Sequence, residues 1–367
     1  MSDDRPIRAL FFAHETTWSG APIQLFHLAR WLQSAGLKVN VAVPKPGSAE
    51  SGPISDEFER SGIEIHPVID LSVPPDFASL SILCQRFDVV VANTLVMWSA
   101  VQAARVAGIP VVWYIHESLV AKHLIELVPE IRPTLDLADA VVMPTQRTAY
   151  LYGTWTERRI EVIPYGIPPL TGADEPAAGR NKPLTFLLLG TYEPRKGQDV
   201  FLGAIALLNE PTRARARFVM AGRVLDRAFY ESLALESRSL PNVSLLDSLS
   251  HDEAAMAIAQ SDVLVCSSRD ETMPVAILEA MSLGKVIVTA KVGGITEWLQ
   301  DGDNALLFPP DDSESLAHSM SLCINEESIL ASLGTRASQT FLEHFSLEAL
   351  GFRFLALFER LIREKTL

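Results

Sequence analysis

Short apolar runs alternate along the chain with stretches in which apolar residues recur every three or four positions. The runs indicate strands and the periodic stretches indicate helices. In the first half, strands are expected at 7–12, 38–43, 62–65, 87–92, 110–115, 140–143 and 161–163. Helices are expected at 95–107, at 120–137 and from Pro22 to Ser34, where the inward residues are Ile23, Phe26, Leu28 and Trp31. This alternation predicts a parallel sheet covered on both faces.

The same pattern resumes at Leu184 and predicts a second sheet of the same kind. Its strands are expected at 184–189, 217–221, 243–246, 262–266 and 285–289, and helices are expected at 198–208, 251–260, 313–324, 326–343 and 347–365. Residues 166–183 are rich in proline and glycine and are expected to form a linker. The sequence thus predicts an α/β fold with two doubly wound, Rossmann-like domains, at 1–165 and 184–345, facing a cleft.

Length and composition suit a soluble two-domain protein of 367 residues. No apolar run approaches the roughly 18 residues of a membrane-spanning helix, and the first residues lack a signal-peptide pattern, so a cytoplasmic location is expected. The net charge of −14 argues against sequence-independent nucleic-acid binding. It weakens, without excluding, contact with an anionic membrane. Three distant cysteines, Cys84, Cys266 and Cys323, are expected to be reduced and structural.

Two glutamates separated by seven residues, Glu271 and Glu279, are the most informative feature of the chain. Pro274 suits the first turn of a helix, so Glu271 is expected on a loop and Glu279, as a partly exposed carboxylate, inside the helix. Predicted strands flank this segment, and its loop should therefore open at the carboxyl edge of a parallel sheet, where doubly wound folds bind ligands. Acidic residues also occur near helix starts simply because they complement the helix dipole.

Two other loops have features of phosphate-binding sites. Gly20 lies before the first predicted helix, where the backbone could approach a phosphate closely, although an ordinary tight turn would look the same. Adjacent Arg195 and Lys196 stand at another helix start, where cationic side chains add to free backbone N–H groups. The His-Asp-Glu run at 251–253 is expected to cap a helix, because three consecutive residues there cannot converge on one metal ion.

The surroundings of the glutamate pair resemble the retaining glycosyltransferases of the GT-B fold, in particular the family 4 group. The residues that carry this resemblance are Glu271, Glu279, Gly284, Gly293, Gly294 and Glu297. The resemblance covers nearly the whole chain and is densest from 184 to 310. It implies that the first domain takes the acceptor, that the second takes a nucleotide-sugar donor, and that the final segment, 346–367, crosses back to the first domain.

The resemblance also implies roles for individual residues. Glu279 would hold the ribose hydroxyls, Glu271 the sugar hydroxyls, and Lys196 with Arg195 the diphosphate, although Thr191 replaces an arginine common in the family. His116 would meet the donor sugar, but a histidine after a buried strand is more often structural. The other implied residues are Gly20, Arg223, Leu249, Met273 and Val275 for the donor, and Asn93 and Glu117 for the acceptor. Tyr165 replaces the family's usual asparagine, and nothing specific follows from it.

These features predict a retaining, metal-independent transfer of a sugar from a nucleotide-sugar donor to an acceptor hydroxyl, with no cofactor. The acceptor could be a glycan, a lipid-linked molecule or a small molecule. The sequence does not distinguish between a UDP-sugar and a GDP-sugar as the donor. Two alternatives remain: a non-catalytic sugar-nucleotide-binding protein and a sugar-nucleotide epimerase on the same fold. A glycosidase with a carboxylate pair is disfavoured, because a phosphate loop would have no purpose in it.

Overall fold

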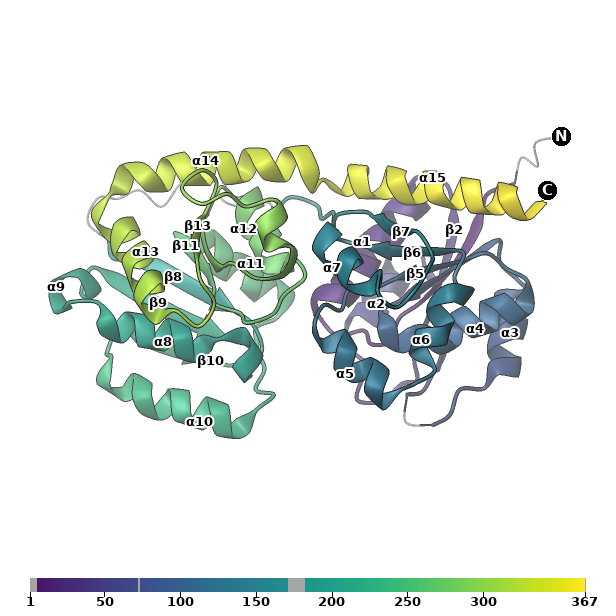
Figure 1. Cartoon of the computed structure of the whole chain (residues 1–367), viewed down its shortest axis with the longest axis horizontal. Coiled ribbons are helices and arrows are strands. Elements are labelled where there is room, and N and C mark those ends of the chain that lie inside the picture. Colours follow the sequence, from purple (N-terminus) through teal and green to yellow (C-terminus); the bar gives the residue numbers. More distant parts are fainter. Residues whose placement is uncertain (1–4, 72, 171–181, 367) are drawn as a thin grey trace. The chain divides into compact units, whose positions relative to one another are not determined.

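The computed structural model describes residues 5–71, 73–170 and 182–366. The chain divides into two compact units, which are coloured along the sequence in Figure 1. Unit 1 consists of Met1–Pro168 and Phe345–Leu367, and unit 2 consists of Pro169–His344. Most of the linker predicted at 166–183 lies outside the described residues, because 171–181 are not described.

Unit 1 is built on a parallel sheet that has, in its described part, seven strands in the order β3-β2-β1-β4-β5-β6-β7. The strands are β1 (Arg8–Phe12), β2 (Lys38–Pro44), β3 (Glu64–Ile69), β4 (Val89–Asn93), β5 (Val111–Tyr114), β6 (Ala140–Met143) and β7 (Ile160–Val162). The helices are α1 (Gly20–Ser34), α2 (Ile54–Arg60), α3 (Phe77–Cys84), α4 (Trp98–Ala107), α5 (Val120–Leu127), α6 (Ile131–Thr134), α7 (Gln146–Tyr152) and α15 (Leu347–Thr366). Strand order reverses between β1 and β4, which is where doubly wound folds open a crevice.

Unit 2 has a second parallel sheet, with six strands among its described residues in the order β10-β9-β8-β11-β12-β13. The strands are β8 (Leu184–Leu189), β9 (Ala216–Ala221), β10 (Val243–Leu246), β11 (Val263–Cys266), β12 (Val286–Ala290) and β13 (Leu306–Phe308). The helices are α8 (Gln198–Leu207), α9 (Glu210–Arg213), α10 (Arg227–Glu236), α11 (His251–Gln260), α12 (Val275–Ser282), α13 (Ser313–Asn325) and α14 (Glu327–His344). Here strand order reverses between β8 and β11.

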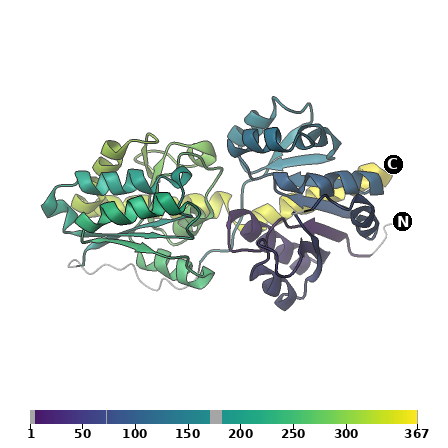
Figure 2. The same cartoon turned by 90° about the horizontal axis from the view of Figure 1, so that it is seen from below.

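Helices cover both faces of each sheet (Figures 1 and 2). In unit 2, α8 packs with α13 in one layer, while α12 packs with α14 in the other. The central strands are mostly apolar because both of their faces are buried, whereas the edge strands β3, β7 and β10 are partly exposed. The predicted fold class, two doubly wound parallel-sheet units, is therefore confirmed.

Several predicted boundaries were wrong for local reasons. Helix α1 begins at Gly20, so Pro22 is its third residue, a position where proline is tolerated because the first N–H groups have no acceptor within the helix. The helix expected at 120–137 is broken into shorter pieces near Pro129 and Pro133. Strand β13 was missed because its three residues are too few to show a period.

Helix α15 completes the core of unit 1. Its Phe358 packs edge-on against Phe11 of β1, with ring centroids 6.3 Å apart, and its Phe354 packs against Tyr114 of β5 at 5.0 Å. On the neighbouring face, α15 contacts α1, and the Phe352 ring lies 4.9 Å from that of Trp31. The first and last parts of the described chain therefore build one hydrophobic core.

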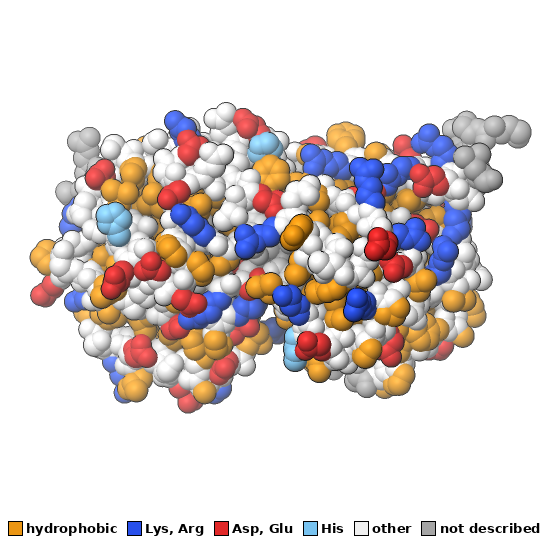
Figure 3. Space-filling view, in the orientation of Figure 1, with side chains coloured by type: hydrophobic (Ala, Val, Ile, Leu, Met, Phe, Trp, Pro, Cys, Tyr) orange, Lys and Arg blue, Asp and Glu red, His pale blue; other side chains and the backbone are white. Residues whose placement is uncertain are grey.

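The surface and the cysteines agree with a globular protein. Figure 3 shows acidic and basic side chains interspersed over the face in view. Cys84, Cys266 and Cys323 are buried and free, as predicted. Within the described ranges, no helix has both the length and the apolar content that crossing a bilayer requires.

The contact between α1 and α15 depends on a glycine. A Cβ at residue 351 would lie closer than 3.0 Å to atoms of the Trp31 ring. Alanine favours a helix over glycine by about 1 kcal/mol. We nevertheless expect Gly351→Ala to lower the free energy of unfolding in urea by about 1–3 kcal/mol, because overpacking outweighs this gain.

The control for this prediction is Trp31→Ala, which removes the obstacle. In that background, adding Gly351→Ala should be neutral or stabilising. A stabilising effect of Gly351→Ala in the wild-type chain would contradict the described packing of α15 on α1.

Candidate functional site

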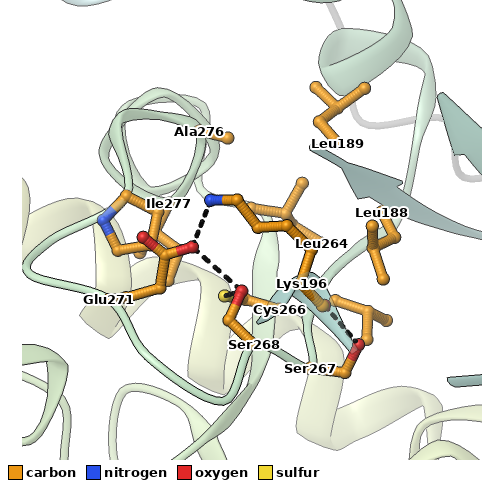
Figure 4. Close-up of a pocket in the computed structure, with 12 residues that line it drawn as sticks. Leu188, Leu189, Lys196, Leu264, Cys266, Ser267, Ser268, Glu271, Ala276 and Ile277 are labelled. Atoms are coloured by element: carbon orange, nitrogen blue, oxygen red, sulfur yellow. Dashed lines mark hydrogen bonds and ion pairs between the residues drawn. The ribbon is translucent and has the colours of Figure 1, made fainter. Parts of the chain in front are cut away.

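The candidate site lies at the carboxyl edge of the unit 2 sheet, where strand order reverses. The loops after β8 and β11 meet there and form a pocket with the start of α12 (Figure 4). Its walls are formed by Leu188, Leu189, Lys196, Leu264, Val265, Cys266, Ser267, Ser268, Glu271, Pro274, Ala276 and Ile277. Doubly wound folds bind their ligands at such a point.

Glycines allow the two loops to approach one another closely. Gly197 follows the short 3₁₀ turn Pro194–Lys196 and has φ 66°, and a Cβ there would collide with the carbonyl oxygen of Ser267. Gly293 has φ 53°, and a Cβ on it would collide with the carbonyl oxygen of Glu271. The backbone of the Glu271 loop is therefore held from two sides by residues that must be glycine.

An ion pair between Lys196 and Glu271 joins the loops. Figure 4 shows the Lys196 amine and the Ser268 hydroxyl directed at one oxygen of the Glu271 carboxylate, and Ser268 Oγ donates to Oε1 at 2.9 Å. The Glu271 side chain is only 11% exposed. Burial alone would raise the pKa of Glu271, but the charges of Lys196 and Arg195 outweigh it and hold this pKa below its ordinary value. Glu271 is therefore ionised at neutral pH.

Two arginines extend this charge network. Arg195 donates to Glu193 Oε1 at 2.7 Å and lies 4.0 Å from Glu271. Arg269 donates to both oxygens of Asp199, at 3.0 and 2.8 Å, and its backbone N–H donates to the Arg195 carbonyl at 2.8 Å. A phosphate entering the site would therefore compete with carboxylates for these cations. Sequence reasoning missed Ser268 and Arg269, which have no motif of their own.

Glu279 lies in the middle of α12 and is buried rather than partly exposed, with 9% of its surface accessible. Within the described part of the chain, no cation or hydrogen-bond donor contacts its carboxylate, and burial raises its pKa to about 7. A buried carboxylate without partners is costly in its charged form. A ligand that brought hydrogen-bond donors would remove this cost.

The other residues predicted for donor binding are spread around this edge. Val275 opens α12, and it and Met273 are buried. Leu249 is half-buried and precedes the capping box formed by Ser250 and Glu253, which confirms the capping role of the 251–253 run. Arg223 is exposed just after β9. Of the residues predicted to bind the donor, only Lys196 and Glu271 are among those that form the pocket walls.

In unit 1, His116 and Asn93 come together at the carboxyl edge of the sheet. His116 Nε2 lies 2.7 Å from Asn93 Oδ1, and Nδ1 lies 2.8 Å from the Tyr165 hydroxyl. The Asn93 amide donates to the carbonyl of Ala21, beside Gly20 at the start of α1. Burial lowers the pKa of His116 to about 3, and the nearby His14 acts in the same direction, so the ring is neutral at pH 7.

Glu117, predicted to contact the acceptor substrate, has a structural role in unit 1. Its Oε2 accepts hydrogen bonds from the backbone N–H groups of Leu95 at 3.0 Å and of His116 at 3.1 Å. These bonds tie the segments that follow β4 and β5 together. Burial raises the pKa of Glu117, although the backbone hydrogen bonds oppose this shift.

Among the residues that the structure describes, no three side chains of the His, Cys, Asp and Glu types gather in a way that could hold an ion. The charged side chains in the walls of the unit 2 pocket are Lys196 and Glu271, and Arg195 lies 4.0 Å from Glu271.

Two protein-family models match adjoining parts of the chain. The model described as Glycosyltransferase Family 4 matches residues 18–169, and the model described as Glycosyl transferases group 1 matches residues 173–340. Together they span both units.

Similar proteins agree with these matches. An uncharacterized glycosyltransferase of Methanocaldococcus jannaschii is 28% identical over 164 residues, which are 44% of each chain. The phosphatidyl-myo-inositol mannosyltransferase of Mycolicibacterium smegmatis is 28% identical over 184 residues, 48% of this chain and 46% of the relative. The matches thus span less than half of these relatives' lengths.

Solved structures share the fold over almost the entire chain. Anabaena HepE in complex with UDP-glucose superposes with a TM-score of 0.81 and 20% identity, covering 96% of this chain and 100% of the other. Sucrose-phosphate synthase from Thermosynechococcus elongatus gives a TM-score of 0.79 and 19% identity, covering 98% and 100%. These similarities support the same architecture.

The raised pKa of Glu279 predicts an unusual dependence of stability on pH. Between the ordinary glutamate pKa of 4.5 and the folded value of about 7, the folded state binds the proton more tightly than the unfolded state. Stability should therefore fall across this window as pH rises, by about 3 kcal/mol from this group. Glu279→Gln should remove that contribution and should be more stable than the wild type at pH 8.

Denaturant unfolding at pH 5 and pH 8 checks this prediction. Glu253→Gln is the control, because Glu253 is exposed and belongs to a helix cap. If Glu279→Gln loses as much stability between the two pH values as the wild type does, the prediction that Glu279 is a buried carboxylate without partners is wrong.

Proposed function

We propose that this chain, which belongs to the family 4 glycosyltransferases of the GT-B fold, transfers a sugar from a nucleotide-sugar donor to an acceptor hydroxyl. Transfer proceeds with retention of configuration and without a divalent metal. The observation that carries the proposal is the pocket at the reversal point of the unit 2 sheet, where the Lys196–Glu271 ion pair lies beside the start of α12. A solved structure of the same fold, Anabaena HepE, holds UDP-glucose, which supports a donor of this class.

The departing diphosphate needs positive charge at the moment of bond cleavage. Lys196 and Arg195 are cations at the start of α8, and the first N–H groups of α12, at Val275 and Ala276, have no acceptor within their helix. Preorganised donors of this kind stabilise charge that develops in the transition state. Since both cations are paired with carboxylates, the donor must share Lys196 and Arg195 with Glu271 and Glu193.

The two glutamates divide the recognition of the donor between them. Glu279 takes the ribose hydroxyls, which supply the hydrogen-bond donors that its buried carboxylate lacks among the described residues. Glu271 takes sugar hydroxyls, with Lys196 and Ser268 fixing the orientation of its carboxylate. A carboxylate held ionised in this way accepts hydrogen bonds and does not act as a proton donor.

Nucleotide-sugar binding is tested by thermal unfolding with a panel of UDP and GDP sugars. A donor at one hundred times its dissociation constant adds about 2.7 kcal/mol of stability, which should raise the midpoint by several degrees. Glu279→Gln should bind the same donor about 10- to 100-fold more weakly, because it loses charge-assisted hydrogen bonds worth about 1.5–3 kcal/mol. The absence of any shift with the whole panel would rule out the proposed donor class.

Transfer is measured by product formation with and without candidate acceptors. Release of free sugar or of an epimer from the donor alone, with no glycoside formed on any acceptor, would favour a hydrolase or an epimerase. Stabilisation by a donor without turnover of any kind would favour a non-catalytic binding protein.

Metal independence is tested with a chelator and two lysine variants. We expect turnover to persist in excess chelator and to fall about 100-fold or more in Lys196→Ala, because one transition-state donor is typically worth that much. Lys291→Ala is the matched control, since Lys291 lies 3.8 Å from Asp301 on an exposed turn. Activity abolished by the chelator and restored by magnesium or manganese, with Lys196→Ala nearly normal, would overturn this part of the proposal.

A further inference from the structure

Four groups in unit 1 form a continuous line of hydrogen bonds. The line runs from the Tyr165 hydroxyl to His116 Nδ1 at 2.8 Å, from His116 Nε2 to Asn93 Oδ1 at 2.7 Å, and from Asn93 Nδ2 to the Ala21 carbonyl at 3.4 Å. Asn93, His116 and Tyr165 are all buried. The line connects the segment after β7 with the ends of β4 and β5 and with the first turn of α1.

The last member of this line fixes the direction of every bond. A carbonyl oxygen can only accept, so the NH₂ group of Asn93 must face Ala21 and its oxygen must face His116. His116 Nε2 must therefore carry a hydrogen. The ring is neutral at pH 7, so Nδ1 has no hydrogen and accepts from the Tyr165 hydroxyl.

We propose that Tyr165 is a positioning residue, whose hydroxyl donates to His116 Nδ1 and holds the ring in one orientation, in the Nε2–H tautomer that Asn93 sets. The inference deepens the proposed function and rests on it for its catalytic consequence. His116 Nε2–H and Asn93 Oδ1 then form a donor next to an acceptor at the carboxyl edge of the unit 1 sheet. Asn93 is fully buried and its Oδ1 already accepts from Nε2–H, so a sugar hydroxyl can meet this pair only at His116, which is 8% exposed. If the ring carried its hydrogen on Nδ1, Nε2 and Oδ1 would both be acceptors and would repel one another.

The packing of Tyr165 suits it to positioning His116. Its ring centroid lies 5.5 Å from that of His116, and the residue is 5% exposed. The Tyr114 ring packs closer still to His116, at 4.2 Å between centroids, yet its hydroxyl finds no partner among the described residues. Packing around the imidazole thus comes from two tyrosines, while the hydrogen bond to Nδ1 comes from Tyr165.

The two tyrosines provide a matched pair of variants. Tyr165→Phe removes the donor to Nδ1 and keeps the ring, whereas Tyr114→Phe removes a hydroxyl that makes no hydrogen bond within the described chain. The tautomer is determined by nitrogen-15 NMR of the imidazole rings in the full chain, with the His116 signals identified by their loss in His116→Gln. We expect the Nε2–H pattern for His116 in the wild type and in Tyr114→Phe, and a shift of the Nδ1 signal in Tyr165→Phe.

Turnover gives the second measurement. A loss of positioning at the reacting sugar should lower kcat about 10- to 100-fold in Tyr165→Phe, with a much smaller change in Tyr114→Phe. Thermal unfolding of both variants separates this effect from a loss of the folded state. An Nδ1–H tautomer in the wild type, an unchanged His116 spectrum in Tyr165→Phe, or equal kcat in the two variants would overturn the proposal.

The NMR result does not depend on the reaction. If the wild type binds no nucleotide sugar and transfers nothing, the proposed function fails, while the Nδ1 signals of the wild type and of Tyr165→Phe still decide whether the Tyr165 hydroxyl bonds His116. If Tyr165→Phe does not fold while Tyr114→Phe does, the Tyr165 hydroxyl has a structural role and the positioning proposal is overturned.

Discussion

The part-buried ion pair between Lys196 and Glu271 is the constraint on which the unit 2 site depends. The two side chains are 19% and 11% exposed, and charges so far withdrawn from water need partners, so removing Lys196 would leave the Glu271 carboxylate to Ser268 and the more distant Arg195. The pair closes the gap between the loops after β8 and β11, and the glycines at 197 and 293 let the backbones come close enough for it to form. The geometry of the pocket thus follows from a requirement for charge balance.

The two glutamates of this region show how position changes the chemistry of one residue type. Glu271 has a lysine, an arginine and a serine around it, so it stays charged and fixed. Glu279, just over one turn into α12, contacts no cation or hydrogen-bond donor among the described residues, and burial raises its pKa to about 7. The Glu271 carboxylate is satisfied by protein groups, whereas that of Glu279 finds none among the described residues. Sites that bind polar ligands often keep such groups at a cost to stability.

The repeated apolar pattern was sufficient to predict the two parallel sheets, because long runs buried on both faces leave a strong local signal. The helix at 251–260 was predicted to the residue, since its capping box is local as well. Strand β13 and the breaks near Pro129 were not predicted, and neither was the burial of Glu279. The roles of Arg269 and Tyr165 depend on partners far away in the chain, which no local pattern records. Ser268 bonds Glu271 only three residues along, but that contact lies in a loop without a motif that would indicate it.

The discontinuity of unit 1 has a consequence for the order in which the protein can fold. A ribosome makes residues 1–168 first, but the apolar face that receives Phe354 and Phe358 stays open to water until α15 has been synthesised. All of unit 2 is translated in between, and its own core is contained in one continuous stretch. Unit 2 can therefore complete its core during synthesis, whereas unit 1 must wait with an exposed hydrophobic surface, at which chaperones could bind the nascent chain.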